Sequence, residues 1–100
     1  MINTNNLTAT QRQKIREQGE NAQRILDDAN VMNFLLVTRS DIVEELTKIS
    51  GFSEEHISKR LALTYNLSGL ERFVDTLRNA VIDKERIVSM EAKVASNPVL

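Results

Sequence analysis

The sequence predicts an all-α protein, an elongated helical bundle that forms a single domain over residues 1–100. Three observations support this class. The 100 residues include only three glycines and one proline, so the breakers that β-turns require are scarce. Apolar residues recur at spacings of three, four and seven, which is the period of an amphipathic helix. A chain of this length with 41% hydrophobic residues can enclose one core.

The first long helix is predicted at about residues 9–37, after an arm at about residues 1–7 that we expect to be flexible. Thr8 and Gln11 have the spacing of a capping box, in which each side chain binds the other residue's backbone N–H. A narrow apolar seam follows and predicts the helix. Its members are Ile15, Ala22, Ile25, Leu26, Ala29, Met32 and Leu36.

The run Val31–Thr38 within this helix is the one segment where a strand competes. It is almost continuously apolar, partly β-branched and of strand length. No second run of this type occurs in the chain, so a strand here would need a partner strand from another subunit. We therefore favour the helix.

A short helical hairpin is predicted next, at about residues 41–50 and 54–66. Ser40 or Asp41 can cap the first helix, and Gly51 can end it in a left-handed conformation. Ser53 can cap the second helix, whose first turn contains Glu54 and Glu55 near the positive end of the helix dipole. The apolar faces of the two helices comprise Ile42, Val43, Leu46 and Ile49, and then Ile57, Leu61 and Tyr65.

The second long helix is predicted at about residues 69–95, with a flexible arm at about 96–100. Ser68 and Glu71 have capping-box spacing at its start. Helices of these lengths would be about 40 and 45 Å long, whereas a compact chain of 100 residues has a radius of gyration of about 13 Å. Their apolar stripes would therefore extend beyond a compact core and meet another chain. The predicted partner interface comprises Ile15, Ala22, Leu77, Val81, Ile87, Val88 and Val94.

The sequence offers no catalytic, cofactor-binding or metal-binding site, so we predict that the protein is not an enzyme. Cysteine is absent, and His56 is the single histidine. No second histidine is available for zinc, and the paired acids Asp27–Asp28 and Glu44–Glu45 are adjacent residues that do not converge on a helix. Nucleophile and phosphate-binding motifs are also absent from the sequence.

One segment, residues 43–61, resembles the helix-turn-helix of phage-repressor-like regulators. The resemblance rests on an apolar residue five positions before Gly51, the pair Phe52-Ser53 after it, and Ile57-Ser58 further on. It implies DNA contacts by Ser53, Lys59 and Arg60. The segment departs from the pattern at Thr47, Ser50 and Arg60. A plain helical hairpin uses the same residues without DNA, and Glu54 and Glu55 would face phosphates unfavourably, so we favour the hairpin.

The predicted function is that of a non-catalytic structural, assembly or adaptor protein that binds itself or another protein through amphipathic helices. Small helical chains without cysteine are common among viral and phage structural or accessory proteins. No stretch approaches the roughly 18–20 apolar residues of a membrane span, and the first six residues lack signal-peptide features. We therefore expect a cytoplasmic protein, or one inside a virion. A DNA-binding regulator is the alternative.

Overall fold

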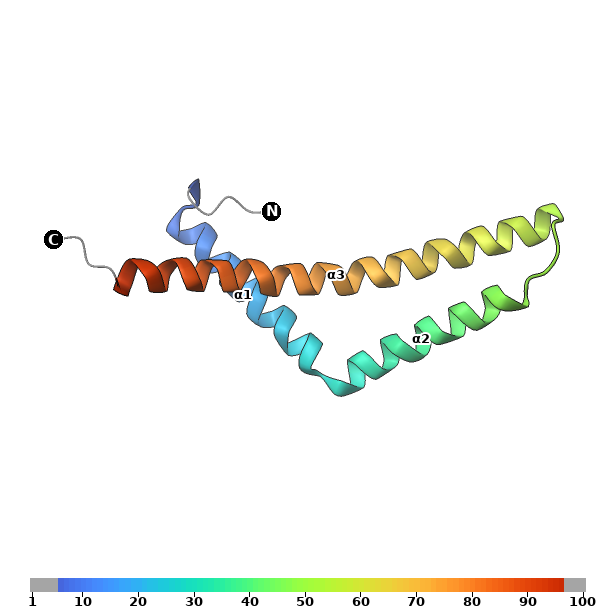
Figure 1. The fold of residues 1–100 in the computed structure, drawn as a ribbon, viewed down its shortest axis with the longest axis horizontal. Helices are drawn as coiled ribbons and strands as arrows, with labels where there is room; N and C mark the ends of the chain where they lie inside the picture. The colour runs from blue at the N-terminus through green and yellow to red at the C-terminus, as the bar shows by residue number, and fades with distance from the viewer. Residues whose placement is uncertain (1–5, 97–100) are drawn as a thin grey trace. The chain divides into compact units, whose positions relative to one another are not determined.

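The computed structural model describes residues 6–96, which form three α-helices (Figure 1). These are α1 (Ala9–Asp27), α2 (Ala29–Lys48) and α3 (Glu54–Ser96), and the described range contains no strand. The predicted all-α class and the hairpin in the middle of the chain are confirmed. None of the helices in the described part combines the length and the apolar character needed to cross a membrane. Most of each predicted arm, residues 1–5 and 97–100, lies outside the described residues.

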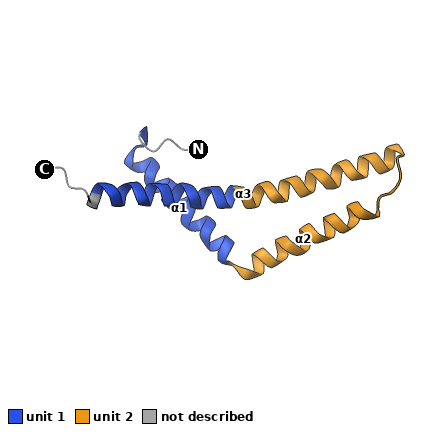
Figure 2. Cartoon of the chain, in the orientation of Figure 1, with its two compact units in different colours: residues 1–27, 76–100 blue, residues 28–75 orange. Residues whose placement is uncertain are grey.

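The chain divides into two compact units (Figure 2). Unit 1 consists of residues 1–27 and 76–100, and unit 2 of residues 28–75. Unit 1 therefore contains α1 and the C-terminal part of α3, while unit 2 contains α2 and the N-terminal part of α3. Unit 1 is a pair of helical segments that lie far apart in the sequence, whereas unit 2 is a hairpin of two segments that follow one another in the sequence.

The predicted first helix over residues 9–37 is wrong, because the chain breaks its helix at Asp28. The backbone of Asp28 is extended, with φ −77° and ψ 105°. Its carboxylate accepts hydrogen bonds from the backbone N–H groups of Asn30 and Val31, at 3.0 and 3.2 Å. Asp28 thus caps a new helix, α2, which extends through the predicted 41–50 helix and ends at Lys48. The Val31–Thr38 run lies in α2, as the favoured interpretation predicted.

Removing this cap tests its contribution to stability. We expect Asp28→Ala to lower the free energy of unfolding by about 1 kcal/mol, because two N–H groups lose their acceptor. Asp28→Asn keeps a side-chain oxygen in place and should retain most of the stability. Urea denaturation followed by circular dichroism measures both variants, and equal losses would contradict a capping role.

The predicted separate helices over 54–66 and 69–95 are joined in the structure, where α3 passes through Gly69 without a break. No glycine of the described residues has a positive φ, so Gly51 does not form the expected left-handed cap. Glycine inside a helix costs only about 1 kcal/mol relative to alanine. Apolar contacts on both sides of Gly69 can offset a penalty of that size, since Leu63, Leu70 and Leu77 are half or fully buried.

In unit 1, α1 packs closely against the C-terminal part of α3. A Cβ atom at Gly19 would clash with Lys84 Cβ and lie 2.9 Å from the backbone oxygen of Ala80. Ala22 is buried on the same face of α1, one turn further on. Small residues at these two positions therefore permit the close approach. The capping box at the start of α1 is confirmed, with hydrogen bonds of 2.8 and 3.1 Å between Thr8 and Gln11.

In unit 2, α2 and the N-terminal part of α3 run antiparallel, joined by residues 49–53 (Figure 1). Arg39 of α2 and Glu71 of α3 form an ion pair across the hairpin at 3.4 Å. Leu63 is the one buried hydrophobic residue among positions 28–75. The hairpin thus encloses a thin core, which leaves much of its apolar surface uncovered.

Candidate functional site

The aromatic residues of the chain are all located in unit 2, and all of them are exposed. The sequence contains three phenylalanines and one tyrosine. Phe34 is 70% exposed, Phe52 83%, Tyr65 67% and Phe73 46%. Aromatic side chains are normally buried to a large extent, and they are enriched where proteins bind one another. The concentration of all four in one hairpin marks unit 2 as the candidate functional surface.

The N-terminal half of α2 is apolar over most of its circumference, with Asn30 and Asn33 as its polar residues before Thr38. Phe34, Leu36 and Val37 are at least half exposed, while their neighbour Leu35 is half-buried. A helix that is apolar around most of its circumference normally lies inside a protein. Within unit 2 only one side of α2 has a helix to pack against, so the outward side chains have no cover from the hairpin itself.

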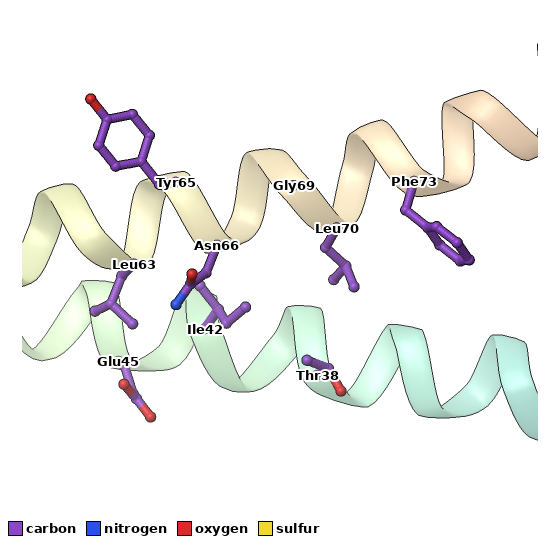
Figure 3. Close-up of a pocket in the computed structure, with 9 residues that line it drawn as sticks. All are labelled: Thr38, Ile42, Glu45, Leu63, Tyr65, Asn66, Gly69, Leu70 and Phe73. Atoms are coloured by element: carbon purple, nitrogen blue, oxygen red, sulfur yellow. The ribbon is translucent and has the colours of Figure 1, made fainter.

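A shallow groove of about 670 Å³ runs between α2 and α3 in this hairpin. Leu63 and Leu70 point toward α2, whereas Tyr65 points away from it (Figure 3). Asn66 lies between the two helices, near Ile42 (Figure 3). The remaining lining residues are Thr38, Glu45, Gly69 and Phe73. The groove is apolar for most of its length and lined by few charges, a lining that suits an apolar side chain or helix.

The connection at the tip of the hairpin is held by several specific contacts. The Arg60 guanidinium donates a hydrogen bond to the Gly51 carbonyl oxygen and lies 5.1 Å from the centroid of the Phe52 ring. Ser53 Oγ accepts a hydrogen bond from the His56 backbone N–H and contacts His56 Nδ1 at 2.5 Å. These contacts hold the connection in place and present Phe52 at its end.

The contact between Ser53 and His56 is explained by the start of α3. Ser53 is the residue before the helix, as the sequence predicted, and His56 occupies the position that glutamate or glutamine takes in a capping box. Within residues 6–96, no group of three His, Asp or Glu side chains is placed to hold a metal ion. The geometry of this pair therefore indicates a helix cap.

The residues predicted to form a partner interface all belong to unit 1, where the structure separates them into three groups. Ala22, Leu77 and Ile87 are buried within the unit, Ile87 completely. Ile15 and Val81 are half-buried. Val88 and Val94 are exposed, at 47% and 72%. The helix pair thus covers the middle of the predicted stripe with its own side chains.

The predicted DNA contacts lie at the tip of unit 2. Lys59 is exposed, whereas the Arg60 guanidinium already binds Gly51 and stacks on Phe52. Residues 28–75 include eight aspartates and glutamates against five lysines and arginines. An acidic balance of this kind repels phosphates.

The four aromatic residues were not predicted as binding residues: Phe34, Tyr65 and Phe73 lie in apolar helix segments that predict a core, and Phe52 lies between the two predicted helices of the hairpin. The available signal was their distribution, since all of them fall between positions 34 and 73. Comparison with known proteins adds no further guide: no family model, curated protein or solved structure matches the chain.

Proposed function

We propose that this chain is a non-catalytic assembly or adaptor protein that binds another protein chain through unit 2. The observation that carries the proposal is the exposure of every aromatic side chain of the molecule on that one hairpin. Phenylalanine and tyrosine each bury about 150–250 Å² when covered, so four uncovered rings represent a large loss of favourable burial. A protein partner that covers these rings would recover it.

The distribution of buried residues supports the same assignment. Ala22, Leu77 and Ile87 are buried in unit 1, whereas Leu63 alone is buried in unit 2. Arg16 and Arg12 of α1 reach Glu91 of α3, so ion pairs also join the two helices of unit 1. Unit 2 also has an ion pair between its helices, Arg39 with Glu71, so the two units differ in their apolar side chains. Unit 2 leaves more of them exposed and therefore offers the larger apolar surface to a partner.

The proposal predicts that binding depends on the exposed aromatics. The tagged wild-type chain and a Phe34→Ser/Tyr65→Ser variant serve as paired baits in cells that express the protein naturally. We expect the wild type to retain a defined partner, or further copies of itself, and the variant to retain at least tenfold less. Quantitative mass spectrometry measures the ratio.

A matched control distinguishes the loss of the binding surface from a loss of the fold. Val94→Ser changes an apolar residue of unit 1 that is 72% exposed, and it should leave the amount of captured protein unchanged. Circular dichroism must show equal helix content for all three baits. Retention by both variants at the wild-type level would contradict the proposal. A specific DNA duplex bound at nanomolar concentration and released by Lys59→Ala would favour the DNA-binding alternative instead.

A further inference from the structure

Five exposed residues lie in one row along the part of α3 that belongs to unit 2. They occur at every fourth position: Ile57, Leu61, Tyr65, Gly69 and Phe73. Ile57 and Leu61 are 52% and 51% exposed, and Tyr65, Gly69 and Phe73 line the groove beside α2. Residues four apart form the ridges that interdigitate when two helices pack at the commonest crossing angle, about −50°. We call these five residues the α3 ridge.

Gly69 interrupts the ridge with a gap that the chain itself does not use. A Cβ atom at Gly51 would clash with the His56 ring, and one at Gly19 would clash with Lys84, so contacts within the chain account for both glycines. At Gly69 a Cβ atom would meet nothing within 4 Å. Glycine inside a helix is nevertheless unfavourable relative to alanine. The open space at Gly69 suits the close approach of a second backbone.

An aromatic residue of the ridge lies on each side of this gap. Tyr65 lies four residues before Gly69, and Phe73 lies four residues after it. A two-fold interface brings one surface patch against the same patch of a second copy. If two ridges cross antiparallel at Gly69, the Tyr65 ring of each copy lies beside the Phe73 ring of the other. The patch is therefore complementary to itself, which identifies the occupant.

We propose that two copies of this chain dimerise by packing their α3 ridges antiparallel, with the helices crossing at Gly69. This inference rests on the proposed protein-binding role of unit 2 and names the partner. Tyr65 of one copy contacts the second copy's Phe73, and the same contact occurs twice. Groove residues such as Ile42 and Leu70 border the crossing point and extend the apolar contact.

The size of the patch sets the strength of the dimer. With exposed fractions of 67% and 46%, Tyr65 and Phe73 together offer roughly 200 Å² of aromatic surface in each copy. A standard interface buries about 800 Å² on each partner, so groove and ridge neighbours must contribute the larger share. An interface at the low end of the size range is typical of weak complexes. We expect a dissociation constant in the micromolar range.

Sedimentation equilibrium over a range of concentrations tests the dimer. The wild type should change from monomer to dimer in the micromolar range, and Tyr65→Ser or Phe73→Ser should weaken association at least tenfold. Val94→Ser changes a 72% exposed apolar residue of unit 1, outside the ridge, and should leave association unchanged. A wild type that stays monomeric at every concentration would overturn the inference. Association that is insensitive to both ridge variants would also overturn it, while leaving the protein-binding role of unit 2 intact.

Photo-crosslinking tests the orientation without removing an aromatic ring. Benzoylphenylalanine in place of Tyr65 should crosslink the second copy near Phe73, and benzoylphenylalanine in place of Phe73 should crosslink it near Tyr65. The same probe in place of Val94, in unit 1, should give no crosslinked dimer. Mass spectrometry locates the crosslinked residues. Crosslinks from position 65 to the second copy's own position 65 would show parallel packing and overturn the proposed crossing.

Discussion

Replacement of Ile87 by alanine is expected to lower the free energy of unfolding by about 2–4 kcal/mol. Ile87 has no exposed surface and lies within unit 1, so the shortened side chain leaves a cavity that the two helices can fill only in part. A loss of this size is a large fraction of the stability of a small domain. Chemical denaturation measured by circular dichroism gives the value.

Ile82→Ala is the matched control for this experiment. It removes the same atoms from the same helix and the same unit, but Ile82 is 44% exposed. The loss should therefore be clearly smaller, at about 1 kcal/mol or less. Similar losses at the two positions would contradict the burial of Ile87 within the chain. A loss at Ile87 that vanished at low protein concentration would instead support the interface role predicted from the sequence.

A second large effect is expected at Gly19. Gly19→Ala should destabilise the protein by about 1–3 kcal/mol, although alanine favours a helix over glycine. The added Cβ atom would clash with Lys84 Cβ and approach the Ala80 backbone oxygen, so α1 and α3 must move apart. Gly19→Leu should have a still larger effect, since its side chain needs more space at the same contact.

Gly69→Ala is the same substitution in a different environment, and it should stabilise the protein. A Cβ atom at Gly69 meets nothing within 4 Å, so the variant should gain up to about 1 kcal/mol from helix propensity. Thermal unfolding of both variants is measured at a dilution where any dimer has dissociated. Stabilisation by Gly19→Ala would show that the helices of unit 1 are not in close contact at this position.

Capping residues in the sequence correctly predicted where α1 and α3 begin. The Thr8 and Gln11 pair forms the expected box, and Ser53 precedes α3 as expected. Asp28 was missed, although an aspartate before an apolar run is itself a capping signal. The apolar seam on both sides of Asp28 favours one unbroken helix, and this pattern outweighed the capping signal.

The sequence by itself determined the all-α class, because glycine and proline are scarce and the apolar residues recur with a helical period. Both signals are local, since each involves residues only a few positions apart. Only the tertiary structure decided where the helices are continuous and which stripe is covered. Gly69 stays helical because leucines on both sides of it are held by packing. Ile87 is buried while Val94 is 72% exposed, although the two lie seven residues apart on the same predicted stripe. Periodicity shows that a residue belongs to an apolar face, whereas burial depends on contacts between segments far apart in the chain.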